Sequence, residues 1–477
     1  MKVVLAALLS AVLFYLSQGL ADVWALAWFA PAPLLWLAYG PVPRWQVLAA
    51  GVVAFAAGQI YLVQCYWGRI PPAILAPLVV ALSVAFGISV VFAREALRRG
   101  SAWTALIAFP AVWTAVEYLI DLVSPHGSYG ALGYAEVSFP AAIQVAALFG
   151  VYAVTFLLCL SANAVALLAR RQWSAGGAGV AVCAAALLFG LIRLAQPEGP
   201  RVEVAALSDA DTRDAESREH TLASEEAAAE SYAAHIARLS GVRVVAIPEG
   251  ALSMRDSDQQ AVLAPLAAAA KAADAMVLTG TFMPAPERNR AFAFLPDGTV
   301  EIYAKRHPLL PFELTVPGRE PGLLGGGYAT QICKDMDFPR TVRDTAALGV
   351  RLMIVPADDF GRDAWIHGRI SIMRGVENGF AVLRSAFDGL ETISDAQGRI
   401  LASAPTTQAG MVAVFAAVPL GPGPTLYTRI GDLFPWLCVA LSILLCVQAF
   451  APGRTAAAAV DAARVDRDDT ASLARLD

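Results

Sequence analysis

Long apolar stretches separated by short polar connections fill the first 200 residues, and one more apolar stretch lies near the C-terminus. A helix needs about 20 apolar residues to cross roughly 30 Å of hydrocarbon. Eight stretches approach that length, at 3–18, 20–40, 47–66, 72–93, 102–122, 140–168, 175–193 and 432–451. The pattern therefore predicts an α-helical membrane bundle of about eight transmembrane helices.

Between residues 200 and 425, short strand-like runs alternate with amphipathic helical stretches. We expect strands at 202–209, 242–250, 275–282, 328–333 and 351–358, helices at 214–239, 257–272, 338–348 and 362–378, and hairpins at 291–307 and 390–403. This alternation predicts a mixed α/β domain with helices covering its sheets. Functional residues should then lie on loops at the strand ends.

The composition agrees with a chain that lies largely in a membrane, because 57% of the residues are hydrophobic and only 16% are charged. The formal net charge is -5, and no basic patch interleaved with aromatic residues is present. These features argue against a nucleic-acid partner.

The positive charges predict the orientation of the bundle, since cytoplasmic connections are rich in Lys and Arg. A cytoplasmic N-terminus leaves only Arg69 in the short outer connections and puts these residues inside: Lys2, Arg44, Arg94, Arg98, Arg99, Arg170, Arg171 and Arg454. We expect transmembrane helices 1–7 in residues 1–196, an extracytoplasmic α/β domain in 197–425, transmembrane helix 8 in 426–454 and a disordered cytoplasmic tail in 455–477.

Cys333 differs from the other five cysteines, all of which fall inside expected membrane spans. It ends an apolar strand-like run and has no cysteine partner in its domain. Such a residue is either a small buried hydrophobe or a reactive thiol. The neighbouring Lys334 favours the second interpretation, because its charge would help to hold a thiolate.

Lys305 is notable because the chain uses arginine for almost every cationic position. Of 35 basic residues only four are lysines, namely Lys2, Lys271, Lys305 and Lys334. A compact ammonium at a strand end can face a single developing negative charge. The alternative is an ordinary solvated charge.

Two acids complete the set of candidates. Glu249 follows the apolar run VVAIP, where it is either a loop or helix-capping acid or a general base for Cys333. Glu313 lies in the apolar loop LLPFEL, where burial requires a partner, and Lys305 lies eight residues earlier.

Together, Glu249 in PEG, Lys305 in YAKRH, Glu313 in LPFE and Cys333 in ICKDMDFP resemble the Glu-Lys-Cys triad and second Glu of the nitrilase superfamily. With spans on both sides, the chain looks like a member of the apolipoprotein N-acyltransferase family. Supporting stretches are FAPAPLLW at 29–36, FPAVWTAVEYL at 109–119, LGYAEVSFPAAIQVAALFGVYAVTFLL at 132–158 and TLYTRIGDLFPW at 425–436.

The resemblance implies an αββα sandwich in a multi-pass protein of the bacterial inner membrane, with the catalytic domain on the periplasmic side. It implies that Cys333 takes an acyl chain from a phospholipid as a thioester and passes it to the α-amine of a diacylglyceryl lipoprotein. Glu249 would be the base, Lys305 would stabilise the oxyanion and Glu313 would orient the site. No metal or soluble cofactor is expected, and we expect a monomer.

The acyl pocket is expected to be lined by residues near these strand ends, namely Phe282, Met283, Phe312 and Lys334, and to be covered by a Gly-rich lid at 311–328. The histidines His307 and His367 stand alone beside arginines, so we interpret them as structural. Arg374 and Glu377, three residues apart, are expected to form a pair on a helix surface.

The chain departs from the family pattern at two places. Lys334 and Asp335 follow the nucleophile where the family usually has an aromatic residue and Glu, and Phe312 precedes Glu313 where Gly is usual. An enzyme that acylates another amine, or a membrane-bound amidase, therefore stays open. A transporter would need ionisable groups near mid-membrane, and Glu117 and Asp121 instead lie toward one end of their span. A pseudoenzyme scaffold would be expected to have lost part of the triad.

Overall fold

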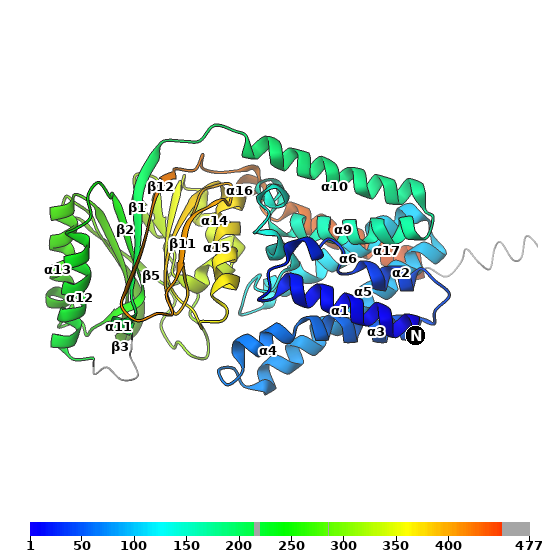
Figure 1. Cartoon of the computed structure of the whole chain (residues 1–477), viewed down its shortest axis with the longest axis horizontal. Helices are drawn as coiled ribbons and strands as arrows, with labels where there is room; N and C mark the ends of the chain where they lie inside the picture. Colours follow the sequence, from blue (N-terminus) through cyan, green and yellow to red (C-terminus); the bar gives the residue numbers. More distant parts are fainter. Residues whose placement is uncertain (214–219, 285, 451–477) are drawn as a thin grey trace, which may run out of the picture.

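The computed structural model describes residues 1–213, 220–284 and 286–450, in two units. A helical bundle forms one end of the molecule and an α/β domain forms the other (Figure 1). The domain is inserted between the last two long helices of the chain, so it is attached to the bundle by two connections. The tail expected to be disordered, 455–477, lies outside the described residues.

Helices that are long and apolar enough to cross a membrane make up most of the bundle. Five are found in the described residues: Arg44–Tyr66 (α3, Arg44–Gly58, with α4, Ile60–Tyr66), α5 (Pro72–Arg99), α6 (Ala102–Val123), α9 (Val151–Ala169) and α10 (Trp173–Leu194). Shorter apolar helices are α1 (Lys2–Gln18), Pro140–Phe149 (α7, Pro140–Ile143, with α8, Ala146–Phe149) and most of α17 (Leu433–Phe450).

Three of the eight expected spans are not continuous helices: 47–66 is divided at Gln59 into α3 and α4, and two others are broken as follows. Residues 20–40 form the 3-10 turn η1 (Trp24–Leu26) and the short helix α2 (Ala32–Ala38), which begins after Pro31. The expected span 140–168 is interrupted at Gly150, whose φ of 78° ends α8 before α9 begins. Apolarity predicts which residues avoid water, but proline and a left-handed glycine decide where a helix breaks.

The broken segment after α1 still runs the length of the bundle. At the domain end, the carbonyl of Gln18 accepts a hydrogen bond from Arg369 at 2.5 Å. At the opposite end, Arg94 donates to the carbonyls of Ala38 at 2.7 Å and Gly40 at 3.0 Å. Arg170 donates to the Trp36 carbonyl there as well, so arginines gather at the end away from the α/β domain.

The α/β domain is a sandwich of two six-stranded sheets, with strand orders β12-β1-β2-β3-β4-β5 and β11-β10-β9-β8-β7-β6. The strands are β1 (Arg201–Asp209), β2 (Val244–Ser253), β3 (Met276–Pro284), β4 (Glu287–Phe294), β5 (Val300–Ala304), β6 (Leu323–Gly325), β7 (Tyr328–Thr330), β8 (Leu352–Asp358), β9 (Ala381–Phe387), β10 (Leu390–Ser394), β11 (Ile400–Pro405) and β12 (Met411–Pro419). The two inner faces meet in an apolar core that includes Val204, Leu278, Ile354 and Leu383.

Helices cover both outer faces of the sandwich, which gives the four-layered αββα arrangement. The first sheet is covered by α12 (Leu222–Ile236) and α13 (Gln259–Ala273), at the end of the molecule farthest from the bundle (Figure 1). The second sheet is covered by α14 (Pro339–Ala346) and α15 (Ala364–Asn378), which face the bundle. Short segments complete the fold: α11 (Ala210–Arg213), η2 (Leu132–Glu136), η3 (Cys333–Asp337) and α16 (Leu426–Ile430).

The strand and hairpin pattern agrees with much of this architecture. The expected hairpins are β4-β5 and β10-β11, and the five expected strands overlap β1, β2, β3, β7 and β8. The expected helix at 214–239 is described only as α12, since residues 214–219 lie outside the described ranges. Strand β12, in the Ala-rich run MVAVFAAVP, was not predicted, although it pairs antiparallel with β1 from Arg201↔Pro419 to Asp209↔Met411.

Helix α15 packs between the second sheet and the bundle, which overturns one expectation. Arg374 and Glu377 are 3.0 Å apart and both side chains are fully buried, so they do not form a surface pair. Arg374 donates to the Tyr134 hydroxyl at 2.6 Å, and Glu377 accepts from the Val151 N–H at 2.7 Å. Their helical spacing was read correctly, but the bundle covers the face that a lone domain would expose to water.

Candidate active site

Lys305 follows β5 and lies between two carboxylates. Its ammonium donates to Glu249 Oε1 and to Glu313 Oε1, each at 2.7 Å, and its side chain is 2% exposed. Burial alone would lower the pKa of Lys305, but Glu249 and Glu313 raise it above its usual value. The amine therefore stays charged and in a fixed position.

Glu249 lies on β2, where a neighbouring strand and an amide hold its carboxylate. Asn289 on β4 donates to the same Oε1 at 2.6 Å. Gly280 on β3 packs so closely that a Cβ there would lie 2.5 Å from the Glu249 Cα. Burial raises the pKa of Glu249, and the Lys305 ammonium opposes that shift.

Cys333 begins the turn η3 with φ of 43°, in the left-handed region that non-glycine residues rarely adopt. Such strain is typical of functional positions. Its Sγ lies 3.7 Å from the Asp358 carbonyl at the end of β8. Burial, followed by the negative charge of Glu249, raises the pKa of Cys333 well above its usual value, although Lys305 opposes this. The resting thiol is thus protonated, and a base is needed to activate it.

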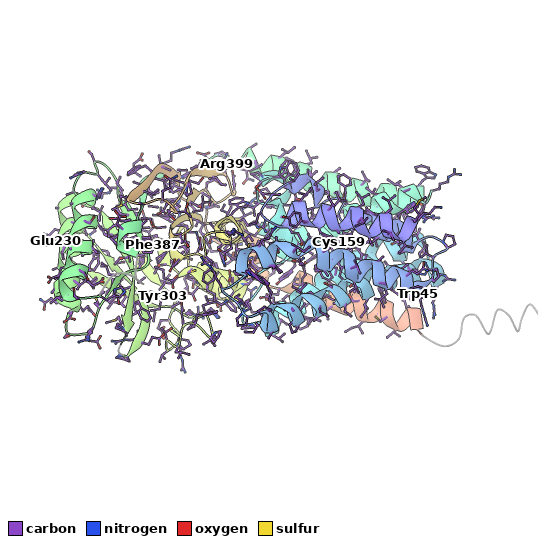
Figure 2. The ribbon with its side chains drawn as sticks, turned by 60° about the horizontal axis from the view of Figure 1, so that its bottom comes forward. Trp45, Cys159, Glu230, Tyr303, Phe387 and Arg399 are labelled. Atoms are coloured by element: carbon purple, nitrogen blue, oxygen red, sulfur yellow. The ribbon has the colours of Figure 1, made fainter. Side chains whose placement is uncertain are left out.

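Asp335, noted in the sequence only as a departure from the family pattern, ties the Cys333 turn to the strand that leads to Lys305. Its two carboxylate oxygens accept hydrogen bonds from four groups: the N–H of Arg306 at 3.0 Å, the N–H of His307 at 2.8 Å, the N–H of Ile332 at 3.1 Å and the hydroxyl of Tyr303 at 2.7 Å. Tyr303 lies within the α/β domain, whereas Cys159 lies among the helices of the bundle (Figure 2). A carboxylate two residues after the nucleophile, where the family usually has Glu, was the signal that could have identified Asp335.

One cavity of about 450 Å³ joins these residues to the bundle. Its polar end is lined by the four candidate catalytic side chains Glu249, Lys305, Glu313 and Cys333. The wall on the bundle side comes from α3, α4, α5 and α6. It is mainly apolar, through Phe55, Leu62, Leu75, Leu78, Leu82, Trp113 and Ile120, and Gln59 and Glu117 add polar groups to it. The site is therefore shared by both units.

Three of the four residues expected to line the pocket, namely Phe282, Phe312 and Lys334, do line this cavity. Met283 does not, because side chains alternate along β3 and Met283 points to the other face. It is fully buried in the core beneath α12 and α13.

The two histidines make different contacts. His307 stacks on Phe338 with ring centroids 3.6 Å apart, and its Nε2 lies 2.6 Å from the Thr341 hydroxyl. His367 Nε2 lies 3.2 Å from Asp363 Oδ2, and the ring also lines the cavity. Their structural role stays a prediction. Among the described residues, no group of three or more His, Cys, Asp or Glu is placed to hold a metal ion.

Comparisons with known proteins agree with this division. The family model for the apolipoprotein N-acyltransferase N-terminal domain matches residues 10–164, and the carbon-nitrogen hydrolase model matches residues 205–420. The fold and site thus define a carbon-nitrogen hydrolase domain carried by a membrane-type bundle. In this order of domains, the chain is similar to the apolipoprotein N-acyltransferases.

Individual relatives match along nearly the whole chain. The chain is 27% identical to the apolipoprotein N-acyltransferase of Geobacter metallireducens, covering 94% of this chain and 95% of that protein. It is 27% identical to the one from Chromobacterium violaceum, covering 90% and 92%. Among solved structures, an amidase from Nesterenkonia sp. is similar to it at 21% identity with a TM-score of 0.38, covering 49% of this chain and 94% of that one.

Proposed function

We propose that this protein is a membrane-bound N-acyltransferase. It moves an acyl chain from a phospholipid, through a thioester on Cys333, to the α-amine of a diacylglyceryl-cysteine lipoprotein. One observation carries the proposal: the cavity at Cys333 continues along a mainly apolar wall made by three membrane-type helices, Arg44–Tyr66, α5 and α6. That wall suits a substrate with a hydrocarbon chain better than a small water-soluble amide.

The first half-reaction forms the thioester. Glu249 takes the proton of Cys333, and Sγ attacks the ester carbonyl carbon, forming a C–S bond. The Lys305 ammonium donates to the oxyanion of the tetrahedral intermediate. The C–O bond to glycerol then breaks, Glu249 returns its proton to the leaving oxygen, and lysophospholipid departs.

The second half-reaction forms the amide. The neutral α-amine of the acceptor attacks the thioester carbonyl, a C–N bond forms and the C–S bond breaks. Glu249 takes a proton from the amine and returns it to the cysteine sulfur, so that the enzyme is regenerated and the atoms balance. Glu313 keeps Lys305 directed at the reacting carbonyl through its 2.7 Å contact.

We propose that the bundle crosses the bacterial inner membrane eight times, with the domain on the periplasmic side. Residues 1–196 would supply seven crossings and residues 426–454 the eighth, with 197–425 as the catalytic domain. The run of residues 19–40 along the bundle supports a crossing by a broken helix. The arginines at the far end support a cytoplasmic location for that end.

Intact-mass spectrometry of the full chain, incubated with phospholipid vesicles without an acceptor, tests this function. We expect a hydroxylamine-sensitive acyl adduct on wild type and none on Cys333→Ala. Cys446→Ala is the matched control, because Cys446 is exposed on α17, and it should keep the adduct. A folded wild type that forms no adduct with any common phospholipid would overturn the proposal.

Adding an acceptor to the acylated protein distinguishes the proposed acyl transfer from amidase chemistry. A diacylglyceryl peptide should discharge the adduct and gain its mass, while water alone should do so much more slowly. Rapid discharge by water, without peptide acylation, would instead support a membrane-bound hydrolase.

A further inference from the structure

A second cation lies beside Cys333 in the cavity. Lys334 follows the nucleophile directly, lines the cavity and is 5% exposed. Its ammonium lies 2.8 Å from Nδ1 of His126 and 6.0 Å from the centre of the Phe338 ring. His126 belongs to the loop that follows α6, so this contact joins the domain to the bundle.

The contact fixes the protonation of His126. An ammonium group can only donate, so Nδ1 must accept and the ring proton must lie on Nε2. Burial, together with the charge of Lys334, also lowers the pKa of His126 to about 4. His126 is therefore a neutral imidazole, and it does not neutralise Lys334.

The other cations of the cavity wall are balanced by carboxylates. Lys305 contacts Glu249 and Glu313, and His367 lies 3.2 Å from Asp363. In the part of the chain that the structure describes, no carboxylate forms an ion pair with Lys334. Asp337 and Glu313 attract it from farther away, and burial lowers the pKa of Lys334. A charge that is desolvated without a partner is costly, so binding an anion there is favourable.

The surrounding loop holds this pair in place. The N–H and the hydroxyl of Ser128 both donate to the Asp337 carbonyl, at 2.9 Å and 2.8 Å. Gly127, at φ of 53°, packs where a Cβ would lie 2.4 Å from that same oxygen. His126 is thus fixed over the turn that carries Cys333 and Lys334, which makes a preorganised pair of donors.

We propose that Lys334 and His126 bind the phosphate group of the acyl donor while its ester carbonyl reaches Cys333. The ammonium of Lys334 and the Nε2–H of His126 are the donors. A glycerophospholipid carries one phosphate a few bonds from its ester groups, which suits an unbalanced ammonium adjacent to the nucleophile and an apolar wall beyond. This inference rests on the proposed function and assigns the donor's headgroup phosphate to these two residues.

The test compares two donors with identical acyl chains, phosphatidylglycerol and diacylglycerol, which lacks the phosphate. The rate of Cys333 acylation is measured by intact mass in the full-length protein. Lys334→Met should slow acylation by phosphatidylglycerol about 10- to 100-fold, as expected for loss of a charge-assisted hydrogen bond. Its rate with diacylglycerol should stay close to that of wild type, and His126→Phe should show the same selectivity more weakly.

Lys271→Met, at an exposed position on α13, is the matched control and should leave both rates unchanged. If Lys334→Met slowed both donors equally, Lys334 would act on the nucleophile or the fold, and the phosphate site would be overturned. Unchanged rates with both donors would overturn it as well.

A binding measurement keeps this inference separate from the proposed function. Native mass spectrometry of Cys333→Ala, with and without Lys334→Met, measures phosphatidylglycerol binding when no thioester can form. We expect Lys334→Met to weaken binding even if wild type yields no adduct, in which case only the proposed function fails. Equal binding by the two variants would overturn the headgroup site.

Discussion

Lys305 combines two roles that usually compete. Its charge must be available to an oxyanion, yet the side chain is buried and already donates to Glu249 and Glu313 at 2.7 Å each. An ammonium has three protons, so one remains for the substrate. The two carboxylates thus keep Lys305 charged and directed, and little reorganisation is needed during the reaction.

Replacement of Lys305 by methionine should therefore damage both catalysis and stability. We expect Lys305→Met to slow thioester formation about 100- to 1000-fold, as for loss of an oxyanion donor. It also leaves two acids without a counter-charge, which should cost about 3 to 5 kcal/mol of unfolding free energy. Intact-mass kinetics and thermal unfolding in detergent measure the two effects, with Lys271→Met as control. A variant that kept the wild-type rate would exclude Lys305 as the oxyanion donor.

His367 makes the stability of the protein depend on pH in the neutral to alkaline range. Burial alone would lower its pKa, but Asp363 raises it from 6.5 to about 9. The folded protein thus holds this proton more tightly than the unfolded chain. The stabilisation is complete below pH 6.5 and is lost as the pH rises through 9, by at most about 3 kcal/mol. Thermal unfolding between pH 6 and pH 10 should show this loss in wild type, and it should be absent in His367→Gln.

His307 serves as a control, because its pKa shift makes stability depend on pH on the acid side. Burial and the nearby Arg306 lower the pKa of His307 to about 4, so the folded protein disfavours its protonation. The contribution of neutral His307 to the unfolding free energy is present above pH 6.5 and is lost as the pH falls toward 4. His307→Gln should therefore alter the acid side of the profile and leave the alkaline side unchanged. The assignment to His367 would be wrong if His307→Gln removed the alkaline loss.

At the scale of single residues, the sequence predicted the candidate catalytic residues better than the residues that hold them in place. Residue chemistry and family resemblance singled out Glu249, Lys305, Glu313 and Cys333, which the structure brings around one cavity, while their catalytic roles stay predictions. Asn289 and His126 could not be found in this way, because each matters through a partner 40 or 208 residues away. Met283 was expected in the pocket because it follows Phe282, but neighbouring side chains of a strand point to opposite faces, so it points away from Phe282.

Among the elements, the loop after α6 links the bundle to the catalytic turn. It lines the cavity from His126 to Ala131 and is hydrogen-bonded to Asp337 through Ser128. Since η3 carries both Cys333 and Asp337, a shift of this loop would displace the nucleophile. Part of the active-site geometry therefore depends on an element of the bundle.

Substitutions at two glycines of this loop distinguish the effect of a steric clash from the effect of backbone strain. Both have positive φ, 53° at Gly127 and 86° at Gly130, but only at Gly127 would a Cβ meet the Asp337 carbonyl, at 2.4 Å. We expect Gly127→Ala to slow Cys333 acylation at least about 10-fold by displacing the loop. Gly130→Ala adds backbone strain without a clash and should affect the rate much less. Equal effects on the acylation rate would mean that the close packing at Gly127 is unimportant.

Elements were predicted most reliably where the pattern was local. The turns at Asp297-Gly298 and Gln397-Gly398 identified both hairpins, because such pairs favour tight turns. Strand β12 lacks a clear alternation, and its partner β1 lies at the other end of the domain sequence. The breaks within 20–40 and 140–168 occur at Pro31 and at the left-handed Gly150, which a count of apolar residues does not take into account.

For the whole molecule, the proposed orientation in the membrane predicts which positions a thiol reagent can reach from each side. We expect a cysteine at position 172, at the arginine-rich end, to react with a membrane-impermeant maleimide only after cells are permeabilised. A cysteine at position 271, on α13, should react once the outer membrane alone is opened. The labelling uses Gln172→Cys and Lys271→Cys in a Cys333→Ala, Cys446→Ala background, and reversed accessibility would contradict the proposed topology.

The pairing of β12 with β1 has a consequence for biogenesis. Strand β1 is made as soon as the chain leaves α10, but its outer edge remains unpaired until β12 has been synthesised. An open, apolar edge invites pairing with other chains. Because β12 directly precedes α16 and α17, it emerges as the final helix begins to insert. Completion of the first sheet and insertion of the last helix thus coincide. A nascent chain stalled before residue 411 would leave the edge of β1 unpaired and prone to aggregation outside the membrane.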